Sequence, residues 1–238
     1  MSELNDKIKN AAKWSSITEI VAKLIAPVST MVLARLLTPD AFGVVATISM
    51  VISFAEIFTD AGFQRYIIQN EFSSEEQKYQ ATNVAFLTNL FMSLFLWGLI
   101  IAFNESLARL VGNPGLGHVI IIACVSLPLA AFSSIQIALF KRDFDFKTLF
   151  YVRLIGIFIP VLITIPLALV LKNYWALIIG IIAVNLSNAI LLTIKSKWKP
   201  NLSYRFSELK KMLPFCSSTI IDTILVWGTG YFDIFIIG

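Results

Sequence analysis

The sequence predicts an all-α, polytopic transmembrane helical bundle, and three observations support this prediction. Of the 238 residues, 57% are hydrophobic and 14% are charged, whereas soluble domains carry roughly 25% charged residues. The mean hydropathy is +0.79. Apolar runs that approach the length of about 20 residues needed to cross the hydrocarbon core recur along the chain, and each run is apolar on most faces rather than along one stripe. These features indicate a multi-pass membrane protein rather than a soluble domain.

Seven apolar runs are predicted to span the membrane, and turn chemistry separates them in order along the chain. Thr38-Pro39-Asp40 ends the first run, a Gly-Asn-Pro-Gly sequence at 112–115 ends the third, and Lys172-Asn173 ends the fifth. Short connections of this kind join neighbouring helices. The predicted spans cover residues 14–37, 42–68, 81–103, 118–140, 147–171, 174–194 and 214–238.

A basic connection at residues 195–213 divides the predicted helices into two groups. Residues 1–194 are expected to form an N-terminal six-helix bundle, and 195–213 a cytoplasmic linker that is either an interfacial helix or a solvated loop. The serine-rich start of the run at 214–238 resembles the start of the first run. Because transporters are often built from two similar halves, residues 214–238 are expected to be the first helix of a second bundle, truncated in this chain.

The basic residues predict the orientation, since basic loops are retained in the cytoplasm. Fourteen lysines and arginines fall in the N-terminus and in alternate connections on its side, against three on the other side, Arg35, Arg109 and Lys172. The N-terminus is therefore predicted to be cytoplasmic, without a cleaved signal. This asymmetry accounts for the basic pI near 9.1, so no nucleic-acid partner is expected. Cys124 and Cys216 lack metal-ligand spacing, and no metal or cofactor is expected.

Ionisable residues inside the predicted spans are the candidate functional residues, because a charge in hydrocarbon is costly unless it faces a cavity or a partner. Glu19 and Lys23 are four residues apart on one helical face and form either a self-neutralising pair or part of a site. Glu56 and Asp60 also share a face. Two such carboxylates require a proton, a cation or a basic partner between them.

Four of these charges are predicted at similar depths. At 1.5 Å per residue, Lys23, Asp60, Arg153 and Asp222 lie about 9–13 Å from the cytoplasmic ends of their helices. They either converge on one polar cavity, where Lys23 and Arg153 meet an anionic ligand, or form separate pairs between helices. Near the other face, Arg35 either pairs with Asp233 or extends to the interface.

Several segments together resemble bacterial polysaccharide flippases, members of the multidrug/oligosaccharidyl-lipid/polysaccharide exporter superfamily. The resemblance covers nearly the whole chain and is specific in the combination and order of its segments. These are LARLLTPDAFG at 33–43, FTDAGF at 58–63, IIQ at 67–69, GNP at 112–114, ALFKRDFDF at 138–146, YWAL at 174–177 and FDIFIIG at 232–238.

The resemblance implies a transporter in the bacterial inner membrane rather than an enzyme. Such flippases have twelve to fourteen helices in two bundles and move undecaprenyl-pyrophosphate-linked oligosaccharides to the periplasmic leaflet by alternating access. Lys23 and Arg153 would then bind the pyrophosphate, while Glu19, Glu56, Asp60 and Asp222 would balance charge or bind a coupling ion, H+ or Na+. Polysaccharide polymerase and glycosyltransferase machinery are the implied protein partners, alongside membrane lipids.

Three other hypotheses remain open from the residues alone. The Glu56 and Asp60 pair also suits a cation-coupled multidrug exporter. A chain that ends where a second bundle begins would also suit a non-transporting fragment or scaffold. A membrane enzyme acting on polyprenyl phosphates is disfavoured, because His118 is the only histidine and the loops hold no clustered acidic motif beyond Glu75-Glu76.

Overall fold

Helices account for all the regular structure in the described part of the chain. The computed structural model describes residues 2–60 and 62–237, with side chains at 6, 8–60 and 62–229. Within these residues, seven helical segments are long and apolar enough to cross a membrane. The predicted all-α polytopic bundle is therefore confirmed.

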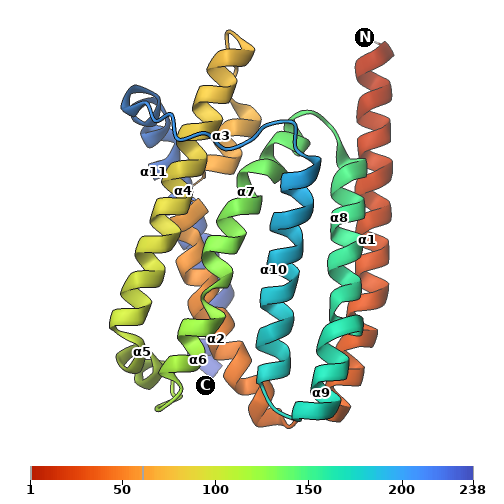
Figure 1. Ribbon diagram of the computed structural model, residues 1–238, viewed down its shortest axis with the longest axis vertical. Coiled ribbons are helices and arrows are strands. Elements are labelled where there is room, and N and C mark those ends of the chain that lie inside the picture. Colours follow the sequence, from red (N-terminus) through yellow and green to blue (C-terminus); the bar gives the residue numbers. More distant parts are fainter. Residues whose placement is uncertain (1, 61, 238) are drawn as a thin grey trace.

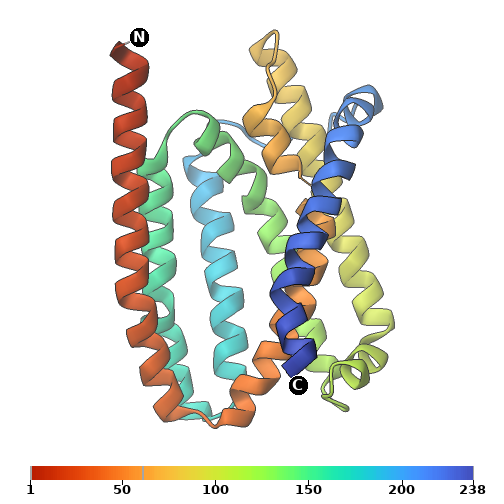
Figure 2. The ribbon, with the colours of Figure 1, turned by 180° about the vertical axis from the view of Figure 1, so that it is seen from behind.

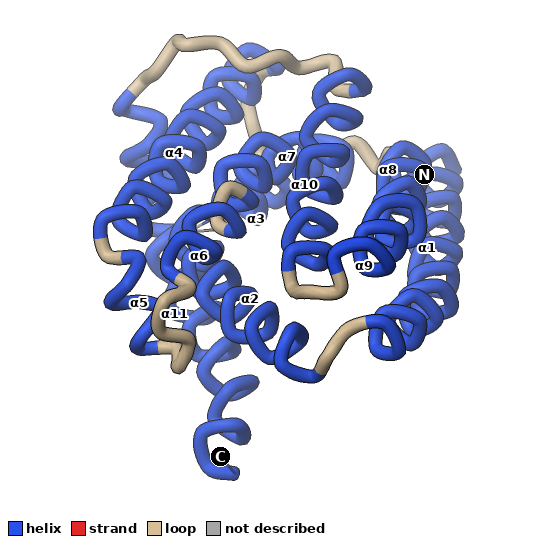
Figure 3. The backbone as a smooth tube through the Cα atoms, turned by 60° about the horizontal axis from the view of Figure 1, so that its bottom comes forward, coloured by secondary structure: helices blue, strands red, loops and turns tan. Residues whose placement is uncertain are grey.

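The helices run back and forth along one axis, with α1 and α8 at one side of the bundle and α4 and α11 at the other (Figures 1 and 3). The N-terminus and the connections α3–α4, α7–α8 and α10–α11 lie at one end, here called the N-terminal end (Figure 1). The elements are α1 (Ser2–Leu36), α2 (Pro39–Asp60), α3 (Phe63–Gln69), α4 (Glu75–Ala102), α5 (Asn104–Leu110), α6 (Gly117–Ala123), α7 (Ser126–Arg142), α8 (Phe146–Ile159), the π-helical turn η1 (Pro160–Thr164), α9 (Ile165–Leu171), α10 (Trp175–Lys195) and α11 (Phe206–Ile237).

Local side-chain caps explain where several helices begin. The Ser74 hydroxyl accepts a hydrogen bond from the Gln77 amide at 3.1 Å and starts α4. Asp145 caps α8 by accepting from the Thr148 amide at 3.1 Å. Such oxygens satisfy amide groups that have no partner in the first turn of a helix. Helix boundaries at these points follow directly from the sequence.

Several boundaries differ from the sequence-based expectation. The second span was predicted as one helix over 42–68, but α2 ends at Asp60 and α3 begins at Phe63. Gly62 has φ +83°, a left-handed conformation that ends a helix at little cost for glycine. The seventh helix begins at Phe206 instead of residue 214, so half of the predicted linker belongs to α11. In the fifth span, Pro160 opens the π-helical turn η1.

Small residues allow the helices to approach closely, while large apolar residues face outward. Ala81, Ala85 and Ala138 lie in a core cluster that joins α3, α4, α7 and α11 near the N-terminal end. Close approach through small side chains is the usual way in which helices pack in membranes. Leu24, Phe91 and Leu162 are 67%, 70% and 71% exposed, which suits contact with lipid tails.

Candidate functional site

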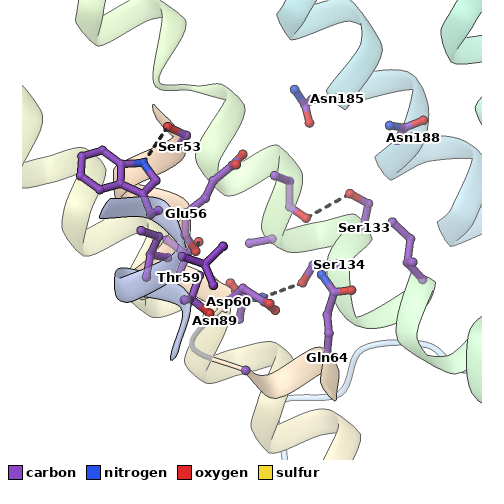
Figure 4. A pocket seen from close by; sticks show the side chains of 18 residues that line it. Ser53, Glu56, Thr59, Asp60, Gln64, Asn89, Ser133, Ser134, Asn185 and Asn188 are labelled. Carbon is purple, nitrogen blue, oxygen red and sulfur yellow. Dashed lines mark hydrogen bonds between the residues drawn. The ribbon is translucent and has the colours of Figure 1, made fainter. Parts of the chain in front are cut away.

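A polar cavity of about 570 Å³ lies inside the bundle between α2, α4, α7, α10 and α11 (Figure 4). Most of the residues that line it carry a carboxylate, amide or hydroxyl group, and no lysine or arginine is among the described residues that line it. Burying polar groups within a membrane span is costly unless they serve a ligand or one another. The carboxylates and amides are Glu56, Asp60, Gln64, Asn89, Asn185 and Asn188.

Helix α2 places both carboxylates in the cavity. Glu56 and Asp60 are one turn apart and therefore share a helical face. Asp60 is the last residue of α2 and lines the cavity, so the C-terminal end of α2 lies at the wall. Glycine is required at position 62 because a β-carbon there would lie 2.6 Å from Cβ of Thr219 on α11, in addition to the strain at positive φ. The break in the helix and the contact with α11 are thus linked.

Asn89 brings a buried amide from α4 to the same wall. The side chain is 1% exposed, and its Nδ2 donates to Ser134 Oγ on α7 at 2.6 Å. Within the described structure, Oδ1 of Asn89 and Oδ1 of Asp60 are both buried without a hydrogen-bond partner. Figure 4 shows the Asp60, Asn89 and Ser134 side chains gathered at one part of the cavity.

Helix α10 supplies the opposite wall. Asn185 and Asn188 lie three residues apart on one face and point into the cavity (Figure 4). A buried polar contact fixes α10 against α7, since Gln136 Nε2 donates to Thr193 Oγ1 at 2.9 Å. The amides of α10 therefore face the carboxylates of α2 across the cavity.

A second cavity of about 490 Å³ adjoins the first, because Ile137 and Asn188 line both. Its wall carries two cations, Lys141 of α7 and Arg153 of α8, among mainly apolar side chains. The two cavities thus present opposite chemistry on either side of a shared wall, acidic and amide-rich in the first and basic in the second.

The structure does not bring the four charges at similar depth into one cavity. Asp60 lines the first cavity and Arg153 the second. Arg153 Nη2 also lies 3.4 Å from Glu19 Oε1, which joins α8 to α1. Lys23, the expected neighbour of Glu19, is exposed on α1 and makes no ion pair within the described residues. The described structure agrees with the other alternative, separate pairs between helices, since α1 packs against α8 at the side of the bundle (Figure 1).

Asp222 lies on α11 and pairs with α3 instead of lining a cavity. Its Oδ2 is 3.1 Å from Arg65 Nη1, and both side chains are more than half exposed. Helix α11 crosses α2 (Figure 2), and Trp227 Nε1 lies 3.5 Å from Ser53 Oγ. Arg35 is exposed at the end of α1. Its expected partner Asp233 has a side chain outside the described residues.

The sequence-based site prediction missed the uncharged polar residues, because it considered only ionisable side chains within the spans. Asn89, Asn185 and Asn188 all lie within apolar spans, and this placement is the signal that would have found them. Lys141 was assigned to a cytoplasmic loop, whereas it lines the second cavity beside Arg153. The site thus depends on amides as much as on carboxylates.

Comparisons with known proteins agree with this architecture. Residues 32–238 match the sequence model of a family described as "Polysaccharide biosynthesis protein". No solved structure matches the chain significantly.

Three curated relatives are similar over much of the chain. An uncharacterized membrane protein in the cps region of Klebsiella pneumoniae is 21% identical over 92% of this chain. The succinoglycan biosynthesis transport protein ExoT of Rhizobium meliloti (strain 1021) is 24% identical over 69% of the chain, and the lipopolysaccharide biosynthesis protein WzxC of Escherichia coli (strain K12) is 20% identical over 93%. The chain spans 45%, 33% and 45% of the lengths of these relatives. Because the family match covers most of its residues, the chain belongs to the polysaccharide biosynthesis protein family of multi-pass membrane proteins, as the sequence resemblance predicted.

Proposed function

We propose that this chain is part of a flippase that moves undecaprenyl-pyrophosphate-linked oligosaccharides across the bacterial inner membrane by alternating access, for surface polysaccharide assembly. Membership of the polysaccharide biosynthesis protein family and the similarity to ExoT, a transport protein of succinoglycan biosynthesis, support a saccharide as the transported molecule. In this proposal, residues 1–194 form one transport bundle, the segment 195–213 connects it to the helix at 214–238, and the N-terminal end faces the cytoplasm.

The polar cavity is the observation that carries the proposal. A sugar unit presents many hydroxyl groups, each of which donates and accepts hydrogen bonds. Carboxylates accept such bonds, and asparagine side chains both donate and accept them. Glu56, Asn185 and Asn188 surround a space of about 570 Å³, within the usual range of roughly 300–1,000 Å³ for small-ligand sites. A cavity of this chemistry suits a neutral polar molecule better than an apolar drug.

The second cavity supplies positive charge for the phosphate groups of the lipid carrier. Lys141 and Arg153 provide positive charge beside apolar residues that suit a polyprenyl chain. Guanidinium groups bind phosphate oxygens in pairs, and lysine binds them as a point charge. Arg153 would have to exchange its contact with Glu19 for one with the pyrophosphate, which couples α1 to ligand binding. Lys23 would reach the ligand only if α1 moved.

Deletion of the gene in the organism that carries it tests the proposal. We expect loss of the surface polysaccharide and accumulation of its lipid-linked repeat unit on the cytoplasmic side. The intact gene should restore export. Versions with Asn188→Leu or Arg153→Gln should restore it poorly at equal membrane levels, whereas Arg109→Gln, far from both cavities, should restore it fully. Normal polysaccharide after deletion, without accumulation of the lipid-linked unit, would refute the proposal.

A cation-coupled multidrug exporter is the second candidate, and the Glu56 and Asp60 pair in the cavity favours it. Carboxylates in a membrane cavity can bind cationic drugs or coupling ions. Efflux of cationic dyes, lost in the deletion strain while surface polysaccharide stays normal, would support this candidate instead. Loss of neither activity would favour a scaffold role.

A further inference from the structure

A further cavity of about 440 Å³, here called the α8–α10 groove, lies between α8 and α10 at the N-terminal end. Figure 1 shows the two helices side by side. Val152 lines both this groove and the second cavity. On α8, Arg153 and Gly156 line the second cavity, whereas Tyr151 and Ile155 line the groove from another side of the helix. The groove is therefore separate from the basic cavity assigned above to the carrier.

Two lysines stand where the groove meets the N-terminal end of the bundle. Lys147 lies in the first turn of α8, and Lys195 is the last residue of α10. Both are exposed, and neither forms an ion pair within the described residues. Asp145 also lines the groove, but its two oxygens accept hydrogen bonds from Thr148 at 3.1 and 2.7 Å. The groove thus carries a net positive charge.

Apolar side chains continue the groove along the spans, away from the lysines. Ile155 lies two turns after Lys147 on α8, and Leu191 lies one turn before Lys195 on α10. Ile155 and Ile194 are 44% and 69% exposed, so this side of the helix pair is open to acyl chains. A lysine pair followed by an apolar surface suits an amphiphile with an anionic head.

Aromatic residues place the lysines at the depth of lipid headgroups. Trp14 of α1 lies beside Tyr151, with ring centres 6.0 Å apart, and Lys147 Nζ is 6.0 Å from the centre of the Trp14 ring. Tryptophan and tyrosine are enriched at the boundary between membrane and water. The lysines are therefore expected to meet lipid phosphates instead of hydrocarbon.

We propose that the α8–α10 groove binds an anionic phospholipid, with the phosphate at Lys147 and Lys195 and the acyl chains along Ile155 and Leu191. Basic pockets between transmembrane helices bind anionic headgroups on the cytoplasmic side, which is the side of this groove in the orientation proposed above. The lipid would join the N-terminal end of α8 to the C-terminal end of α10. Its binding does not depend on the transported molecule, so failure of the lipid proposal would leave the flippase proposal intact, and the reverse also holds.

Thermal unfolding of the purified full chain in detergent with added phosphatidylglycerol tests the groove. Phosphatidylcholine with the same acyl chains is the zwitterionic control, and sn-glycerol 3-phosphate supplies an anionic head without acyl chains. A ligand that binds only the folded state raises its stability. The unfolding midpoint should rise with phosphatidylglycerol, much less with phosphatidylcholine, and not with the same concentration of glycerol 3-phosphate. Native mass spectrometry of the same samples gives an independent affinity.

Variants locate the effect. Lys147→Gln and Lys195→Gln should weaken phosphatidylglycerol binding about fivefold each and about 25-fold together, since a basic residue near an anionic surface contributes about 1 kcal/mol. The double variant Lys147→Arg with Lys195→Arg keeps both charges and should retain binding, which controls for misfolding. Lys9→Gln with Lys210→Gln removes two exposed lysines at the same end, outside the groove, and should bind normally.

Several outcomes would overturn the lipid site. One is an equal response of the midpoint to phosphatidylglycerol and phosphatidylcholine, and another is a response to glycerol 3-phosphate as large as that to phosphatidylglycerol. A third is phosphatidylglycerol binding that survives in the double glutamine variant at 147 and 195, or that falls as far in the variant at 9 and 210. Tighter binding of undecaprenyl phosphate than of phosphatidylglycerol, lost in the same double glutamine variant, would assign the groove to the transported carrier instead.

Discussion

Arg142 is predicted to hold α3 in place, and its removal should destabilise the N-terminal end of the bundle. Its Nη1 donates to the carbonyl oxygens of Ile67 and Asn70, each at 2.7 Å, and to that of Ile68 at 3.2 Å. These carbonyls end α3, where the helix leaves acceptors without partners. The guanidinium also lies 4.8 Å from the centre of the Phe72 ring. One side chain thus closes the end of α3 against α7.

The expected loss of folding stability in Arg142→Ala follows from these contacts. A hydrogen bond to a charged group contributes about 1.5–3 kcal/mol. Because Arg142 is half-buried, we use the lower value for the two shorter bonds, which gives about 3 kcal/mol for Arg142→Ala. Chains of 150–250 residues lose about 2–4 °C in midpoint per kcal/mol, so the midpoint should fall by roughly 6–12 °C. Arg142→Lys should lower the unfolding midpoint less, since the lysine ammonium can keep one of the contacts.

The two buried cysteines provide the assay. Cys216 lies in the same core cluster as Phe63 and Ile67 of α3, and Cys124 lies in a separate cluster. Reaction with a thiol-reactive fluorogenic dye during heating therefore reports when each region opens. The Cys124→Ala background, which leaves Cys216, gives the local midpoint.

Lys141→Ala is the matched control, because Lys141 is the preceding residue in the last turn of α7 and is exposed. Its loss removes the same charge without these bonds and should shift the midpoint by no more than about 2 °C. An equal fall of the local unfolding midpoint in Arg142→Ala and Lys141→Ala would refute the role assigned to Arg142.

Two further predictions concern helix contacts. Gly180→Ala should destabilise the chain by about 1–3 kcal/mol through overpacking, because a β-carbon there would meet the Thr164 side chain of η1; Thr164→Ala should restore part of the loss, and simple additivity of the two in thermal unfolding would contradict the contact. Glu19→Gln and Arg153→Gln should each leave one charge without its partner in the membrane, which lowers the free energy of unfolding by about 2.5–3.5 kcal/mol. The double variant should lose less stability than the sum of the two single losses. Additive losses in a double-mutant cycle would show that the 3.4 Å pair contributes little.

Much of the fold can be predicted from the sequence because its signals are local. The apolar runs determine the spans, since a helix in lipid must satisfy its own backbone hydrogen bonds. Caps such as Ser74 and Asp145 fix where helices begin. The break at Gly62 was also visible in principle, because glycine after a helix is a common stop signal. Apolar residues on both sides of Gly62 led to the prediction of one continuous span.

The site was only partly predictable. Glu56 and Asp60 are four residues apart, and any helix places them on one face, so the sequence alone placed both carboxylates together. Helical spacing also put Glu19 near Lys23, yet the structure pairs Glu19 with Arg153. Sequence spacing determines which residues share a face, whereas the rotation and packing of each helix determine which residue of another helix that face meets.

The sequence by itself therefore determined the membrane class, the seven spans and the carboxylates of α2. Only the tertiary structure brought Asn89 beside Asp60, placed Lys141 with Arg153 and left Lys23 exposed at the side of the bundle. The physical reason is the range of the interactions. Burial in lipid and helix capping act along the chain, whereas contacts between helices depend on how small residues and the turn at Gly62 fit distant segments together.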